Sequence, residues 1–298
     1  MTRFLVLGGS GFLGSRLMKL LPDCYGTFYG SPNVLSAKMC HLEGSDLYEF
    51  EAILKKLKPT VVINCIGFTN VDKCDLFPEK SWQINTEYSH YYAGICKNYK
   101  IKFIQISTDH YYNPLELKLP ESGISKPINQ YGFSKKLSEQ LVLKINPNSI
   151  VVRTNFFHFN FKLPFTFLDA LILNSKNKKE TFSFADVIFT PISTNRLLGY
   201  ILHLIELDFC GLINICSGSE MSKFDFHQQT LRLLGYSREF HHPINIDTMR
   251  LIAHRPKYMA LDNTLLESLI GSKVPHICDM ILEEIHFTNT KELNLGVN

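Results

Sequence analysis

The stretch Phe4-Leu5-Val6-Leu7-Gly8-Gly9-Ser10-Gly11-Phe12-Leu13-Gly14 decides the fold. Its four apolar residues predict a short buried strand, and residues 12–21 predict the helix that follows, ended by Pro22. Glycine between a strand and a helix lets a pyrophosphate approach the main chain, where the free N–H groups and dipole of the helix attract it. We therefore expect Gly8, Gly11, Phe12, Leu13 and Gly14 to form a dinucleotide-binding loop.

The glycine spacing alone does not choose between types of dehydrogenase. Gly9, Gly11 and Gly14 fit the pattern G-x-G-x-x-G, whereas Gly8, Gly11 and Gly14 fit G-x-x-G-x-x-G. A merely structural turn remains the alternative, and the strand and helix on either side argue against it.

Short apolar runs alternate with helical stretches through the first half of the chain. Continuous apolar character predicts strands that are covered on both faces, as in a parallel sheet. Further strands are expected at 25–29, 61–66, 101–106 and 150–153, and helices at 50–57, 82–99 and 131–143. The pattern predicts an α/β protein with a Rossmann-type, doubly wound parallel sheet.

The second half is less regular and predicts a smaller C-terminal substrate-binding lobe. We expect a dinucleotide-binding domain over 1–155 and the lobe over 156–298, with a strand at 211–216 that rejoins the main sheet. Helices are expected at 165–173, 195–207 and 222–234, and Ser222 and Asp225 form a start signal for the last of them. The adjacent pair His241-His242 is expected in a surface loop.

Composition excludes several classes of function. A net charge of +3 over 298 residues, without a long basic tract, argues against a nucleic-acid partner. The eight cysteines are scattered, without a C-x-x-C pair, so we expect reduced thiols and no metal site. No apolar run approaches the roughly 20 residues of a membrane helix, and we expect no membrane contact and a cytoplasmic location.

Tyr131-Gly132-Phe133-Ser134-Lys135 places a phenol and an ammonium one turn apart at the start of a helix. A tyrosine has an ordinary pKa of about 10, and a nearby positive charge favours its phenolate form. We expect Tyr131 to transfer a proton and Lys135 to tune the pKa of Tyr131 and to hold the nicotinamide ribose. An exposed helix face is the alternative for this short motif.

A second polar group follows the strand at 101–106, where Ser107-Thr108-Asp109-His110 begins. Open α/β sheets bind their ligands at the carboxyl ends of strands. We expect the Thr108 hydroxyl to polarise a substrate carbonyl, with Ser107 as the weaker choice. Asp109 and His110 are expected to shape the site or to bind substrate.

In this order, the segments resemble the extended short-chain dehydrogenase/reductases, and within them the dTDP-4-dehydrorhamnose reductase family, nearly from end to end. The resemblance rests on the glycine loop and on a set of further segments: 62–67, 71–73, 84–85, 107–109, 127–135, 153–154 and 255–256. It implies Thr108, Tyr131 and Lys135 as the catalytic residues, and Gly11, Phe12 and Leu13 on the pyrophosphate.

The resemblance also implies further cofactor contacts. Glu43 would lie near the adenine, Ile66 and Gly67 would line the path of the cofactor, and Asn85 would support the site from its helix. The region after the second strand reads Tyr29-Gly30-Ser31-Pro32 and lacks the acid that usually excludes a 2′-phosphate. NADP(H) is therefore favoured, and NAD(H) stays open.

Departures from the family pattern fall where the substrate is expected. Asn155 and Phe156 follow Arg153-Thr154, where relatives tend to carry a tryptophan, and His110 replaces an aromatic residue. We expect Asp109, Asn155 and Phe156 to contact the substrate, and Arg255 to clamp its diphosphate, with a surface salt bridge as the alternative. The aromatic residues of 156–167 suit either core packing or a wall for a sugar ring.

These residues predict reduction of a 4-keto nucleotide sugar by NAD(P)H. Two alternatives stay open at this point: an epimerase or dehydratase that uses the cofactor transiently, and a cofactor-binding regulatory subunit. The sequence names neither the sugar nor the base, and it leaves open whether the chain forms a homodimer.

Overall fold

The computed structural model describes residues 2–30, 38–111, 117–159 and 167–294, with side chains to residue 288. Its centre is a seven-stranded sheet in the order β11-β6-β5-β4-β1-β2-β3, and every pair in it is parallel. The strands are β1 (Phe4–Leu7), β2 (Cys24–Phe28), β3 (Met39–His41), β4 (Val61–Asn64), β5 (Lys102–Ile106), β6 (Ile150–Arg153) and β11 (Gly211–Asn214). The structure confirms the predicted parallel sheet.

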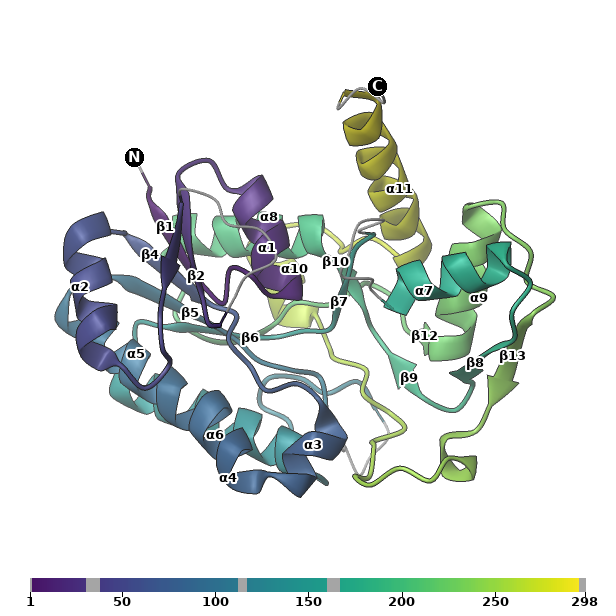
Figure 1. Cartoon of the computed structure of the whole chain (residues 1–298), viewed down its shortest axis with the longest axis horizontal. Helices are drawn as coiled ribbons and strands as arrows, with labels where there is room; N and C mark the ends of the chain where they lie inside the picture. Colours follow the sequence, from purple (N-terminus) through teal and green to yellow (C-terminus); the bar gives the residue numbers. More distant parts are fainter. Residues whose placement is uncertain (1, 31–37, 112–116, 160–166, 295–298) are drawn as a thin grey trace.

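Helices cover both faces of this sheet, as Figure 1 shows. On one face lie α2 (Leu47–Leu57), α5 (Tyr88–Asn98) and α6 (Gln130–Ile145); on the other lie α1 (Phe12–Leu20), α8 (Thr194–Glu206) and α10 (Thr264–Ile270). Alternate residues of β1 enter the two cores: Leu5 packs with the first set of helices and Val6 with the second. Because both faces are buried, the strands carry continuous apolar runs.

The helix predicted at 82–99 consists of several pieces. It comprises the end of α4 (Pro78–Trp82), the π-helical turn η1 (Gln83–Glu87) and α5, and the short helix α3 (Val71–Leu76) precedes them. The side chain of Asn85, in η1, is fully buried and hydrogen-bonds both backbone groups of Phe68. The wider turn thus places an amide against a loop, a tertiary effect that helical periodicity does not register.

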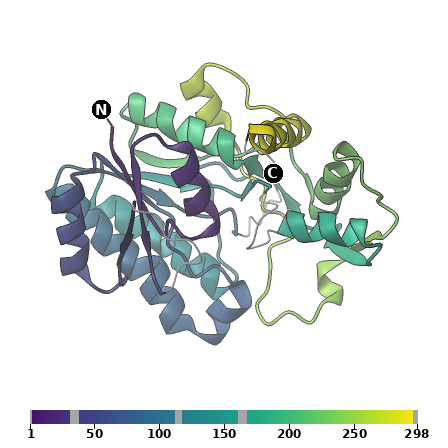
Figure 2. The same cartoon turned by 45° about the horizontal axis from the view of Figure 1, so that its top comes forward.

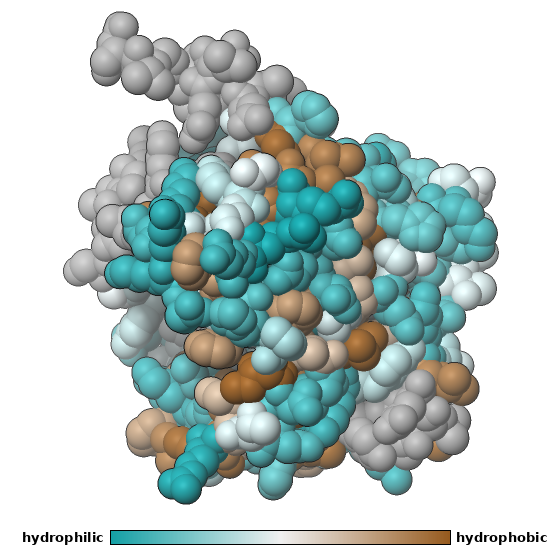
Figure 3. Space-filling model, turned by 90° about the vertical axis from the view of Figure 1, so that its right-hand side faces the viewer, coloured by the Kyte–Doolittle hydropathy of each residue, from teal (hydrophilic) through white to brown (hydrophobic). Residues whose placement is uncertain are grey.

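The smaller lobe is built from short pairs of strands and two helices (Figures 1 and 2). The pairs are β7 (Phe156–Phe157) with β10 (Ile192–Ser193), β9 (Ile188–Phe189) with β12 (Met221–Ser222), and β8 (Thr181–Phe184) with β13 (His241–Ile244). Its helices are α7 (Phe167–Lys176) and α9 (Lys223–Leu233), and the short helix η2 (Ile246–Thr248) follows β13. Figure 3 shows a mainly hydrophilic outer face on this side of the molecule, interrupted by separate hydrophobic groups.

The structure tests two predictions for the second half of the chain, the helix start at Ser222 and the position of His241 and His242. The Ser222 hydroxyl accepts a hydrogen bond from the Asp225 N–H at 3.0 Å, as its start signal predicts. The placement of His241 in a surface loop was wrong, because His241 begins β13 and is buried, while His242 faces outward. Its strand pairs with β8, far away in sequence. Residues 160–166 of the aromatic stretch lie outside the described residues.

The chain returns to the main sheet after it enters the lobe. Strand β11 pairs with β6 over Gly211–Asn214, so the strand expected at 211–216 rejoins the main sheet. Helix α8, which precedes it, packs against α1. The core of the first domain therefore includes residues well beyond 155. None of the helices in the described ranges has the length and apolar character needed to cross a membrane.

The last helix, α11 (Ile277–Asn294), is anchored to the glycine-loop helix by a buried ion pair. The guanidinium of Arg16 contacts the carboxylate of Glu284, which is fully buried. Asn195 donates to the same carboxylate at 2.9 Å, and the Phe287 ring lies 4.6 Å from the Arg16 guanidinium carbon. Removal of one partner would leave the other as an uncompensated buried charge.

We therefore expect Glu284→Ala to lower the free energy of unfolding by about 3–5 kcal/mol, measured by urea denaturation. Glu283→Ala, which removes a half-exposed ion pair with Arg196, is the matched control and should cost at most about 1 kcal/mol. Equal losses in the two variants would contradict a role for the buried pair.

Candidate active site

The glycine loop joins β1 to α1 and is held in a tight form. Gly8 has φ +75°, a left-handed conformation that favours glycine, and its carbonyl accepts from Gly11 N–H at 2.9 Å. A Cβ on Gly14 would lie 2.2 Å from the Gly8 oxygen, so a side chain there would separate the helix from the loop. Close packing of α1 on the loop requires glycine at this position.

The start of α1 suits an anion. Its N-cap residue, Gly11, offers no side-chain acceptor, and the first turn of this described helix carries no acidic residue. The first N–H groups therefore keep their capacity for an external acceptor, and the helix dipole favours negative charge there. These residues fit the pyrophosphate of a dinucleotide, which Gly11, Phe12 and Leu13 would hold.

The other expected cofactor residues lie after the neighbouring strands of the same edge. Ile66, just beyond β4, lies against Gly8, where a Cβ would be 3.3 Å from its side chain, and Gly67 follows it. Glu43 follows β3 and is exposed, with its N–H bonded to Glu49 at 3.0 Å. The structure thus brings these residues to one edge of the sheet, and their cofactor contacts stay predictions.

Asn85 supports this edge through its amide. Its Oδ1 accepts from Phe68 N–H at 2.7 Å, and its Nδ2 donates to the Ser134 hydroxyl at 3.0 Å. Ser134 precedes Lys135 on α6. Asn85 therefore connects the loop after β4 to the helix that carries the Tyr-x-x-x-Lys motif, which fits a positioning role.

Thr108, Tyr131 and Lys135 come together where β5 ends and α6 begins. Asn129 caps α6 through a 2.8 Å bond from the Gly132 N–H to its side chain. Thr108 lies close enough to Tyr131 to act on the pKa of its phenol, and the Thr108 hydroxyl accepts from His110 N–H at 3.2 Å. Lys135 donates from Nζ to the Ile106 carbonyl at 2.6 Å. The structure therefore assembles a hydroxyl, a phenol and an ammonium from two elements.

Burial controls the pKa values of this group. It raises the pKa of Tyr131 to about 12, opposed by the neighbouring Thr108 hydroxyl. It also lowers the pKa of Lys135 to about 8, opposed by the negative charge of Glu139. The expectation that Lys135 lowers the Tyr131 pKa stays a prediction, because desolvation of the phenol is the largest influence in this structure and the Lys135 ammonium is bonded to the Ile106 carbonyl. The phenol is thus held in its protonated form, ready to donate.

Ser107 is engaged elsewhere, which leaves Thr108 as the hydroxyl beside Tyr131. Ser107 donates to Glu139 at 2.5 Å, and Arg153 binds the same carboxylate at 2.7 Å. Tyr111 donates to it as well, at 2.8 Å. This fully buried network fixes the end of β5 against β6 and α6.

The residues expected to bind substrate separate into two groups. Asn155 donates to the Asp109 carboxylate at 2.9 Å, and the Phe156 ring stacks near Phe12, with centroids 5.9 Å apart. Burial raises the pKa of Asp109 to about 6. Arg255 instead pairs with Asp72 at 2.9 Å and donates to the Ala253 carbonyl at 2.6 Å. That pairing is the alternative which the sequence left open for Arg255.

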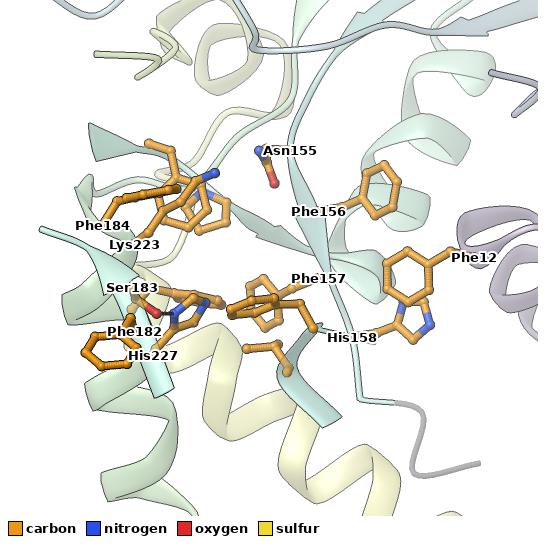
Figure 4. A pocket seen from close by; sticks show the side chains of 15 residues that line it. Phe12, Asn155, Phe156, Phe157, His158, Phe182, Ser183, Phe184, Lys223 and His227 are labelled. Atoms are coloured by element: carbon orange, nitrogen blue, oxygen red, sulfur yellow. Dashed lines mark hydrogen bonds between the residues drawn. The ribbon is translucent and has the colours of Figure 1, made fainter. Parts of the chain in front are cut away.

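A cavity of about 740 Å³ opens beside this site, between the glycine loop and the smaller lobe (Figure 4). Its walls are mainly aromatic, with Phe12, Phe156, Phe157, Phe184, Phe189 and Phe226 among them. Asn155, Lys223, Ser183 and His227 add polar groups. Sequence analysis missed the last three, because the tertiary packing of α9 and β8 brings them to the cavity and no local motif marks them.

A parallel sheet with this glycine loop, and Thr108 beside a Tyr-x-x-x-Lys pair, defines an NAD(P)-dependent oxidoreductase of the short-chain dehydrogenase/reductase class. The model of the family described as RmlD substrate binding domain matches residues 2–286, and the chain belongs to this family.

Individual relatives agree with this placement. The chain is 25% identical over 262 residues to a dTDP-4-keto-6-deoxy-D-glucose reductase of Streptomyces niveus, covering 87% of this chain and 88% of the relative. It is 26% identical to a dTDP-4-dehydrorhamnose reductase of Mycolicibacterium smegmatis, covering 88% of this chain and 78% of the relative.

Solved structures are similar over nearly the whole chain. The dTDP-4-dehydrorhamnose reductase of Clostridium acetobutylicum superposes with a TM-score of 0.81 at 25% identity, covering 97% of this chain and all of that one. The Bacillus anthracis enzyme, solved in complex with NADP, has a TM-score of 0.83 at 23% identity, covering 96% and 99% of the two chains.

The lowered pKa of Lys135 predicts the pH dependence of catalysis. An amine with a pKa of about 8 loses its positive charge as the pH rises through 8, so kcat/KM for carbonyl reduction should fall above that pH. The Tyr131 phenol stays protonated over this range. Lys135→Arg is the control, because a guanidinium keeps its charge and should remove this fall whatever its absolute rate. A wild-type profile that is flat up to pH 10 would contradict the assignment.

Proposed function

We propose that this protein reduces the keto group of a nucleotide-linked 4-keto sugar with NAD(P)H. The observation that carries the proposal is the placement of the Thr108 hydroxyl next to the protonated Tyr131 phenol, with Lys135 one turn further on α6. A reduction needs a proton donor at the carbonyl oxygen, and this pair supplies one at the ligand-binding edge of the sheet.

Each of the three catalytic residues has a separate role at the carbonyl oxygen of the substrate. Thr108 donates a hydrogen bond to the carbonyl oxygen and stabilises the negative charge that develops there. Tyr131 gives its phenolic proton to this oxygen, and the Lys135 ammonium stabilises the resulting phenolate and holds the ribose of the cofactor. When bound, the reduced nicotinamide supplies the hydride that the carbonyl carbon accepts.

NADP(H) is the favoured cofactor. The loop after β2 lacks the carboxylate that would repel a 2′-phosphate, and the Bacillus anthracis structure contains NADP. Ser31 and Pro32 of this loop lie outside the described residues. Use of NAD(H) stays compatible with the open first turn of α1.

Several observations support a nucleotide sugar as substrate. Relatives over most of the chain are named as reductases of dTDP-linked keto sugars. Beside Thr108 and Tyr131, the bonded pair Asp109 and Asn155 offers polar groups for sugar hydroxyls, and Phe156 offers an apolar face. Asn155 and Phe156 line the cavity, and the bond from Asn155 to Asp109 connects the cavity wall to the loop that carries Thr108.

The same residues could serve an epimerase or a dehydratase, and a partial match to a dehydratase covers 47% of this chain. Steady consumption of NADPH with substrate distinguishes net reduction from these reactions. The intact Thr108, Tyr131 and Lys135 set argues against a purely regulatory subunit.

The assembly and the compartment remain proposals of the same account. We keep the homodimer as the proposed assembly, because Tyr91 of α5 and Phe133 of α6 expose aromatic surface on two helices that pack together. Light scattering on the purified 34.2 kDa chain tests it. A cytoplasmic location is proposed from the free state of the eight cysteines.

Tyr131→Phe tests the proposed chemistry. Loss of the proton donor should lower kcat by about 10²- to 10⁴-fold, measured as NADPH oxidation with a dTDP-4-keto-6-deoxy sugar. NADPH affinity, measured by fluorescence titration, should change little. Tyr48→Phe, on the exposed face of α2, is the matched control and should keep full activity. Near-normal turnover in Tyr131→Phe would refute the assignment.

A further inference from the structure

Lys223 is the first residue of α9, and it lines the aromatic cavity together with Asn155. Figure 4 shows both residues at one end of the cavity, with Ser183 and His227 at another. Its Nζ lies 5.9 Å from the centroid of Phe189. Within the described parts of the chain, no hydrogen bond or ion pair ends on this ammonium, whereas Arg255 nearby is occupied by Asp72.

The charge of Lys223 reaches the catalytic loop. It acts on Asp109 and on His110, the two residues that follow Thr108, and on His227, one turn further along α9. One carboxylate oxygen of Asp109 accepts a hydrogen bond from Asn155, and within the described residues Asp109 makes no ion pair with Lys223. An ammonium in mainly apolar surroundings is costly until an anion compensates it.

Lys223 is also the single cation among the described residues on the cavity wall. The other basic groups there are His158 and His227, and burial lowers the pKa of each to about 3, so both are neutral. A ligand that brings an anionic group into this cavity meets the Lys223 amine, whose pKa is lowered by burial and raised by the negative charge of Asp109. The anionic group would contact Lys223 next to the loop that carries Thr108.

We propose that Lys223 binds the diphosphate of the nucleotide-sugar substrate at the catalytic end of the aromatic cavity. The inference rests on the proposed function, and it moves the diphosphate from Arg255 to Lys223. With the diphosphate held there, the sugar is positioned toward Asn155, Asp109 and Tyr131, and the aromatic walls remain for the base.

Binding of dTDP tests this role without any turnover. Isothermal titration of dTDP is carried out on the full chain with saturating NADP⁺, which keeps the nucleotide out of the cofactor loop. Lys223→Met should weaken dTDP binding by about 10- to 100-fold, because a charge-assisted hydrogen bond is lost, and Lys223→Arg should restore most of the affinity. Lys179→Met, at an exposed lysine of the same lobe, should bind as the wild type does.

Binding of a second ligand, thymidine, shows whether Lys223→Met removes only the phosphate-binding site or disrupts the fold. Thymidine carries the base without phosphate, so Lys223→Met should bind it as the wild type does. Equal dTDP affinity in the wild type and Lys223→Met would overturn the proposal and leave the proposed reductase intact, as would an equal loss of thymidine and dTDP binding. A wild type that binds NADP⁺ but no dTDP would overturn both.

Discussion

Because β1, β4 and β5 are parallel neighbours, their carboxyl ends meet at one edge of the sheet, and the candidate site depends on that constraint. The glycine loop follows β1, Ile66 and Gly67 follow β4, and Thr108 follows β5. Helices that begin at this edge direct free N–H groups toward it. The candidate cofactor-binding and catalytic residues therefore lie together at the carboxyl ends of these strands, although they are far apart in sequence.

Buried polar contacts then fix the positions of the strand ends and of α6 relative to one another. Glu139 binds Arg153, Ser107 and Tyr111, and Asn85 joins the loop after β4 to α6. These contacts engage the Ser107 hydroxyl, whereas the Thr108 hydroxyl, which accepts from His110 N–H, keeps its proton available to donate. Desolvation at the same place raises the pKa of the phenol and lowers that of the lysine, which favours a protonated tyrosine.

Local patterns in the sequence were sufficient to predict much of the structure at this edge of the sheet. The strand, glycine loop and helix around Gly11 depend on contacts close in sequence, and so does the spacing from Tyr131 to Lys135. Both were therefore predictable, as was the parallel sheet. The sign of the Tyr131 pKa shift was not, since it depends on burial by distant elements. Lys223, buried His241 and the π-helical turn at Asn85 also escaped prediction, because each is defined by packing between segments far apart in the chain.

The central claim is that this edge delivers a hydride to a sugar carbonyl. Transfer of deuterium from NADPH labelled at the nicotinamide C4 tests it most directly, with the product of a dTDP-4-keto-6-deoxy sugar analysed by mass spectrometry and NMR. The account predicts one deuterium on the former carbonyl carbon and one oxidised cofactor for each product. A product without deuterium, or a cofactor that ends each cycle unchanged, would contradict it.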